Sequence, residues 1–136
     1  MVKLTAVYEG DLHVVATHGP SGRTLATDAP VDNQGRGETF SPTDLVASAL
    51  GACMLTIMGI TARRLGLDLK GARAEVAKEM TMQPPRRIAK LSTEIWLPLP
   101  HRADPHGQLE RAALTCPVHQ SLLAEIEKPV VFHWQE

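Results

Sequence analysis

One long uncharged stretch restricts this chain more than any other feature. No charged side chain occurs between Leu45 and Ile60, whereas Asp44 precedes the stretch and Arg63 and Arg64 follow it. A membrane-spanning helix needs about 20 consecutive apolar residues, more than this stretch supplies. We therefore predict a helix buried in the core of a globular domain, and no membrane partner.

Residues at both ends define the limits of that helix. Ser41 can cap its first turn, Pro42 fits the first helical position, and Asp44 completes a pattern resembling a capping box. Gly66 is suited to end the helix, because glycine adopts the left-handed conformation common after a helix C-terminus. The sequence thus predicts a helix from about Pro42 to about Leu65.

Apolar side chains surround the predicted helix on every side, so it should be buried on every side. A chain of 136 residues struggles to cover such a helix alone. Small residues at 47–49, 51 and 52 would allow another backbone to approach closely. Two explanations stay open here: a second copy of the chain covers the helix, or the chain's own sheet covers it.

The rest of the chain alternates between strand and turn signals. Apolar and polar residues alternate over several stretches, and clusters of turn residues separate them. We predict strands at 2–8, 12–18, 23–27, 68–83, 88–97 and 129–134, and further helices at 105–116 and 117–127. The order β-β-β-α-β-β-α-α-β indicates an α+β fold, which we assign to a single domain spanning 1–136.

Composition narrows the class of protein. Apolar residues make up 43% of the chain and charged residues 21%, as in globular proteins. A net charge of −1 and an aromatic content of 4% argue against a nucleic-acid partner, which needs basic patches and stacking rings. The N-terminal residues lack the apolar segment of a signal peptide. We expect a cytoplasmic protein, in which thiols stay reduced.

The chain contains two cysteines, Cys53 and Cys116. Reduced cysteines in a cytoplasmic protein can be small core residues without reactivity, or they can carry redox chemistry. The composition alone favours the first reading, and the positions of the two residues must decide between them.

Cys53 lies in the apolar helix, well beyond the first turn, where the positive end of the helix has little effect. Since apolar surroundings disfavour a thiolate, a reactive Cys53 needs a cation from elsewhere in the fold. Arg36, in the loop before the helix, and Arg23 are the candidates, because arginine is always charged and offers a planar set of donors. Glu38 or Asp44 could hold that arginine in place.

Cys116 lies at the start of the helix opened by Pro117, where partial positive charge favours a thiolate. His119 follows three residues later and could be a base, a metal ligand or an ordinary surface residue. Cys116 and His119 are spaced like two metal ligands, but the second close pair of a structural zinc site is missing. We predict no metal and no bound cofactor.

Two motifs together resemble the OsmC/Ohr family of thiol-dependent hydroperoxide reductases. The motifs are "SPTDLVASALGACMLTI", around Cys53, and "CPVHQSL", which begins at Cys116. The order of elements is also similar over nearly the whole chain. This resemblance implies an OsmC-like fold, with antiparallel sheets packed around a long buried central helix. It also implies an intertwined homodimer with two active sites at the subunit interface.

The resemblance implies a specific reaction as well. Cys53 would attack an organic hydroperoxide and become a sulfenic acid, and Cys116 would resolve it as a disulfide. A small dithiol, lipoyl-type in the family, would then reduce the disulfide. An apolar pocket lined by residues such as Leu50 and Met54 would favour organic hydroperoxides over hydrogen peroxide.

The chain departs from the family pattern at two places. In the Ohr branch a catalytic arginine lies in the first glycine-rich turn, where this chain has Pro20; in the OsmC branch the arginine comes from the loop before the helix, where Arg36 could serve. Thr43 replaces the family's glutamate after the helix-opening proline, and Asp44 lies beside it. A competing hypothesis follows from Thr43: a non-catalytic dimer of this fold that binds an apolar or thiol ligand in its interface pocket.

Overall fold

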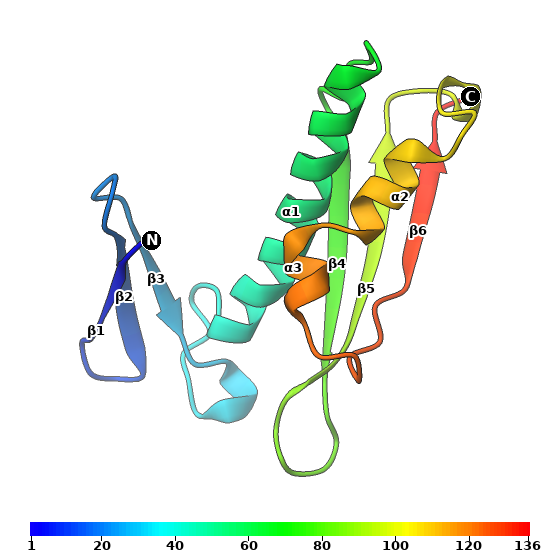
Figure 1. Cartoon of the computed structure of the whole chain (residues 1–136). Helices are drawn as coiled ribbons and strands as arrows, with labels where there is room; N and C mark the ends of the chain where they lie inside the picture. Colours follow the sequence, from blue (N-terminus) through cyan, green and yellow to red (C-terminus); the bar gives the residue numbers. More distant parts are fainter. The chain divides into compact units, whose positions relative to one another are not determined.

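The computed structural model describes all residues from 1 to 136. Its contacts divide the chain into two compact units, Met1–Val46 and Ala47–Glu136, and the boundary falls inside one continuous helix. The strands and helices follow one another in the predicted order β-β-β-α-β-β-α-α-β, with two short 3-10 helices in addition (Figure 1). The α+β fold class is therefore confirmed.

The first unit is built on a three-stranded antiparallel sheet. Its strands β1 (Leu4–Tyr8), β2 (His13–His18) and β3 (Thr24–Asp28) pair in sequence order, as the alternation of apolar and polar residues predicted. A tight turn with positive φ angles at Gly10, Asp11 and Leu12 joins β1 to β2. The register sets His13 at the start of β2 opposite Asp28 at the end of β3.

Large apolar side chains remain exposed on this sheet. Leu4, Val7 and Tyr8 of β1 are 69%, 56% and 63% exposed, and no residue of β1 is buried. Several large exposed apolar groups along one strand are typical of a surface that another element covers. The first unit therefore has too little core of its own to account for its apolar residues.

The long helix α1 (Pro42–Arg64) begins and ends as predicted. The Ser41 N–H donates to Asp44 Oδ2 at 2.9 Å, and the Asp44 N–H donates to Ser41 Oγ at 3.0 Å, which together form a reciprocal capping box. Gly66, with φ +72°, follows the last turn in the left-handed conformation. Both signals are local, which explains why the sequence was sufficient to place the helix.

Only one face of α1 is buried in the single chain. Gly51 lies against strand β4 (Arg73–Met80), because a Cβ at Gly51 would come within 3.1 Å of Val76 Cγ2. The other residues of this face are buried too: Ala47, Leu50, Met54, Met58, Thr61 and Ala62. On the other side Ala52 and Thr56 are exposed and Ile60 is 51% exposed. The expectation of burial on every side is thus wrong for one chain, because one sheet can cover only one face.

By length and composition α1 could also cross a membrane, with a mean hydropathy of 2.0 over 18 residues. This is weak support for a membrane span, because the core helix of a globular protein can meet the same criterion. The capping box and the packing of Gly51 on β4 match the predicted core helix.

The second unit carries the other sheet, in the order β4-β5-β6. Strand β5 (Ile88–Leu97) pairs antiparallel with β4, whereas β6 (Val130–Trp134) runs parallel to β5. The family resemblance implied antiparallel sheets, and every pair of neighbouring strands is antiparallel except β5 and β6. The segment 68–83 is a strand, as its alternating pattern predicted, although β4 is shorter than that range.

Two short helices follow β5, and both differ in length from the prediction. Helix α2 (Gln108–Leu114) starts later than expected, because both oxygens of the Asp104 carboxylate accept backbone N–H groups, from Gln108 at 2.8 Å and Leu109 at 3.0 Å. Helix α3 (Pro117–Ser121) stops well before 127. There the Lys128 ammonium donates to the carbonyls of Leu123 and Ile126 and so stabilises a non-helical turn.

Candidate active site

Two thiols distant in sequence meet in the second unit. Cys53 lies in the middle of α1 and is half-buried, and Cys116 directly precedes α3 and is 0% exposed. The Cys53 side chain is within hydrogen-bonding reach of the Cys116 thiol, and both cysteines are free. The fold therefore brings together the two residues that the sequence singled out for redox chemistry.

The surroundings of Cys116 favour its neutral form. Burial raises the pKa of the Cys116 thiol above 9.0, and a hydrogen bond and the charge of Cys53 raise it further. Backbone N–H groups of His119 and Val118 act in the opposite direction, with the His119 N–H at 3.4 Å from Sγ. The predicted position at the start of a helix is confirmed, and the helix donors lower the pKa of Cys116 as expected, but burial raises it by more.

His119 contacts Cys116 through its main chain, and its side chain is half-buried. Its backbone N–H, rather than its ring, makes the hydrogen bond to Cys116. Burial, followed by the charge of Lys128, lowers the pKa of the His119 ring below 6.5. The ring therefore stays neutral at physiological pH.

Leu50 and Met54 flank Cys53 on α1, and both are 0% exposed. They belong to the core between α1 and its sheet rather than to a surface open to a ligand in the single chain. Of these three residues, only the half-buried Cys53 offers accessible surface.

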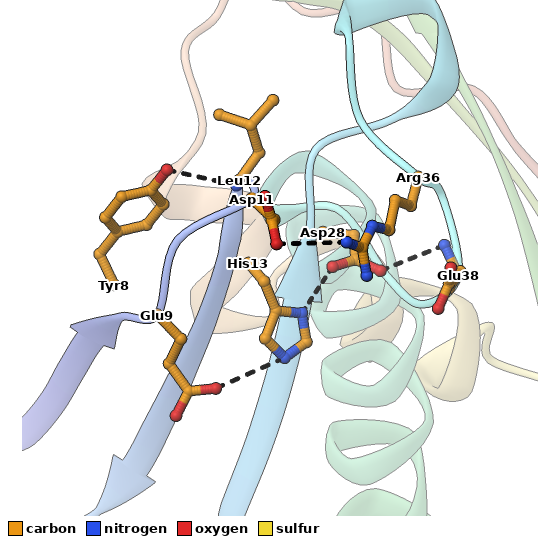
Figure 2. A network of polar contacts seen from close by, with 8 residues as sticks. All are labelled: Tyr8, Glu9, Asp11, Leu12, His13, Asp28, Arg36 and Glu38. Carbon is orange, nitrogen blue, oxygen red and sulfur yellow. Dashed lines mark hydrogen bonds and ion pairs between the residues drawn. The ribbon is translucent and has the colours of Figure 1, made fainter.

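Arg36 belongs to a polar network in the first unit, which Figure 2 shows at close range. Its guanidinium contacts the Asp11 carboxylate at 3.2 Å, and the two side chains are 60% and 77% exposed. Such an exposed ion pair contributes little to stability, typically below about 1 kcal/mol. Arg36 is therefore held loosely by its own side chain. The alternative, Arg23, has its backbone N–H bonded to Ser21 Oγ.

The centre of this network is Asp28, a residue that sequence reasoning missed. Asp28 is only 4% exposed, and its Oδ1 lies 2.6 Å from His13 Nδ1. Its Oδ2 accepts the Glu38 N–H at 3.2 Å (Figure 2). The hydrogen bond from His13 lowers the pKa of Asp28 below 3.8; the charge of His13, the Glu38 N–H and the charge of Arg36 add to the effect, and burial opposes it.

The two predicted carboxylates have defined local roles. Glu38 takes part in the network through its backbone N–H, which donates to Asp28. Asp44 accepts the Ser41 N–H in the capping box of α1, and Ser41 Oγ also lies 3.2 Å from Thr43 Oγ1. Neither of these contacts joins a carboxylate to Arg36. No group of three or more histidine, cysteine, aspartate or glutamate side chains is arranged to hold a metal.

The sequence and the fold of the chain are similar to those of known proteins. The sequence model of the family described as OsmC-like protein matches residues 35–128. A structure from Psychrobacter arcticus 273-4, provisionally named an osmotic stress induced and detoxification response protein, is 43% identical. It superposes with a TM-score of 0.89 over 98% of this chain and 96% of that one. No curated protein sequence matches the chain.

More distant structures share the fold. An organic hydroperoxide resistance protein OsmC from Legionella pneumophila is 12% identical, with a TM-score of 0.79 over 98% of this chain and 96% of that one. The organic hydroperoxide resistance protein OhrB of Bacillus subtilis is 15% identical, with a TM-score of 0.72 over 97% of each chain. At these identities the likeness establishes the fold and nothing more.

Proposed function

The chain belongs to the family of OsmC-like proteins, and from this premise we propose that it is a peroxidase that reduces organic hydroperoxides with two cysteines. One observation carries the proposal: the thiols of Cys53 and Cys116 lie within hydrogen-bonding reach of each other inside one chain. A disulfide requires two cysteines that are close in space, as these two side chains are.

The proposed reaction has three steps. The Cys53 thiolate attacks the hydroperoxide oxygen; the O–O bond breaks, Cys53 becomes a sulfenic acid, and the alkoxide takes a proton and leaves as an alcohol. The Cys116 thiol then condenses with the sulfenic acid, releasing water and forming the disulfide. Finally, a dithiol of the lipoyl type reduces the disulfide by exchange and leaves as its own cyclic disulfide.

The unequal burial of the two cysteines supports this division of roles. Cys53 is half-buried and can meet a small substrate, whereas Cys116 is completely buried and can meet only a neighbouring group. Burial also raises the pKa of Cys116, which disfavours Cys116 as the attacking thiolate. We assign the cation that stabilises the Cys53 thiolate to Arg36, with Glu38 and Asp44 in supporting positions.

We further propose that the active protein is a homodimer. The exposed side of α1, with Ala52 and Ile60, and the exposed apolar residues of β1 support this proposal, because both surfaces fit burial against a second copy. In such a dimer the substrate pocket, with Leu50 and Met54 behind Cys53, would be completed by the partner. We place the reaction in the cytoplasm, where both thiols stay reduced.

Steady-state peroxide consumption tests the proposal. With cumene hydroperoxide and dihydrolipoamide, the wild-type protein should turn over, and Cys53→Ser should abolish turnover. Cys116→Ser should still give one fast reduction of peroxide, without sustained dithiol-dependent turnover. If the wild type consumes no peroxide while it binds dihydrolipoamide or an apolar probe, the chain is a binding protein of this family.

A further inference from the structure

The two cysteines of the second unit lie close to each other but differ in their access to solvent. The Cys53 side chain is within hydrogen-bonding reach of the Cys116 thiol. Cys53 is half-buried, whereas Cys116 is 0% exposed. A molecule from solution can therefore reach the first sulfur but not the second. The second sulfur can react only with a group that is attached to the first.

The side chains beside Cys53 on the exposed side of α1 are small. Side chains three or four residues apart on a helix are neighbours, and here Thr56 and Ala49 hold those positions, both of them exposed. The Thr56 hydroxyl donates to a backbone carbonyl of its own helix at 2.8 Å. The larger neighbours Leu50 and Met54 lie in the core. A small molecule can thus approach the Cys53 sulfur from the side of α1 that the chain's own sheet leaves uncovered.

We propose a further activity for this pair: the reduced protein reduces low-molecular-weight disulfides by thiol–disulfide exchange, with Cys53 as the attacking residue and Cys116 as the resolving residue. The activity uses the same two sulfur atoms as the proposed peroxidase, but it needs neither a peroxide nor a sulfenic acid. The substrate is a small disulfide because Cys53 is half-buried in the middle of a 23-residue helix. The homodimer proposed above would also bring a second copy close to this side of α1.

The proposed reaction consists of two exchange steps. The Cys53 thiolate attacks one sulfur of the external disulfide RSSR, whose S–S bond breaks; RS⁻ leaves and takes a proton, and Cys53 is joined to the other RS group. The Cys116 thiolate then attacks Cys53 Sγ, expels the second RS⁻ and closes a disulfide within the chain. The external disulfide gains two electrons and two protons, and the two protein thiols lose them. A small dithiol reduces the protein again by exchange.

The burial of Cys116 gives the second step its direction. Burial raises the pKa of the Cys116 thiol. A thiol of higher pKa is the stronger nucleophile once it is ionised, and it is the poorer leaving group. Attack of Cys116 on the mixed disulfide therefore expels the external thiol. Because this step needs the Cys116 thiol to lose its proton, its rate should rise with pH through the alkaline range.

A reaction of the reduced protein with hydroxyethyl disulfide, without peroxide, tests the order of the two residues. Wild type should release two equivalents of mercaptoethanol and lose two hydrogens in mass, with Cys53 linked to Cys116. Cys116→Ser should release one equivalent and stop as a mixed disulfide on Cys53, and Cys53→Ser should not react on the same timescale. A mixed disulfide that persists in wild type, or one that forms on Cys116 in Cys53→Ser, would overturn the proposal.

Sustained turnover distinguishes an activity from a single reaction. With dihydrolipoamide as the reductant, wild type should reduce hydroxyethyl disulfide at least about 10-fold faster than Cys53→Ser, because the resolving step is intramolecular. The Cys53→Ser sample measures the uncatalysed exchange between the two small molecules. Equal rates in the two samples would overturn the proposal. Insulin, whose disulfides lie within a folded protein, should not be reduced faster than by dihydrolipoamide alone; faster reduction would overturn the restriction to small disulfides.

These assays contain no peroxide, so their outcome does not depend on the proposed peroxidase. Disulfide reduction by a protein that consumes no peroxide would support this proposal and exclude the peroxidase. Peroxide consumption by a protein that reduces no small disulfide would overturn this proposal alone.

Discussion

At the level of single residues, burial decides what each cysteine can do. Cys116 is 0% exposed and its pKa is raised, although two backbone N–H groups at the start of α3 favour a thiolate. Removing a charge from water costs more hydration free energy than a few partial charges in the protein restore. The position of Cys116 was readable from the sequence, but its protonation state depends on packing by distant residues.

The raised pKa of Cys116 predicts how stability changes with pH. The folded protein retains a proton that the unfolded chain releases near the ordinary thiol pKa of 9.0. Stability from this group is therefore complete below that pH and lost as pH rises through the higher pKa of the folded state. The free energy of unfolding, measured with urea at a series of alkaline pH values, should fall more steeply with pH for wild type than for Cys116→Ala. Parallel curves would contradict the assignment.

The polar network of the first unit shows which single residues the sequence could and could not predict. Arg36 and Glu38 were proposed as site residues because they lie in the loop before an evident helix. Asp28 and His13 were missed, because only the pairing of β2 with β3 sets them opposite each other. A histidine at the start of one predicted strand and an aspartate at the end of the next was the signal that could have found them.

Among the secondary-structure elements, α1 shows what local signals can achieve. Ser41, Asp44 and Gly66 act within one turn of the helix ends, so the sequence predicted both ends. The start of α2 and the end of α3 were wrong, because Asp104 and Lys128 reach across several residues to bond the backbone there. Short helices take their limits from such contacts, whereas a long helix takes them from its own caps.

The capping box of α1 gives a prediction about stability. Ser41→Ala removes the acceptor of the Asp44 N–H, and the free energy of unfolding should fall by about 1 kcal/mol. Ser48→Ala is the control, since Ser48 is exposed on the same helix and alanine has the higher helix propensity. Urea denaturation of both variants measures the difference. An equal change in the two variants would contradict the importance of the cap.

For the molecule as a whole, the exposed apolar surface of one chain is the main observation. The sequence left open whether a second copy or the chain's own sheet covers the uncharged helix. The sheet covers the face with Gly51 and Met54, and it leaves Ala52 and Ile60 exposed. Sequence periodicity could not predict this division, because apolar residues occur on both faces.

A charge on that uncovered face should prevent dimer formation. Ile60→Glu is expected to shift the protein from dimer to monomer, because an unpaired carboxylate would be buried in the interface. Val131→Glu is the matched control: Val131 is also 51% exposed, but it lies on the opposite face of the second sheet from α1. Sedimentation equilibrium measures the association. A wild-type monomer, or a dimer unaffected by Ile60→Glu, would contradict the proposed assembly.

The most direct test of the proposed chemistry is the mass of the intact chain after one equivalent of cumene hydroperoxide. Formation of a disulfide within the chain removes two hydrogens, so the mass should fall by about two units, and peptide mapping should link Cys53 to Cys116. Cys116→Ser should instead gain the mass of one oxygen, and Cys53→Ser should not change. An unchanged wild-type mass, with both thiols still free, would contradict the account.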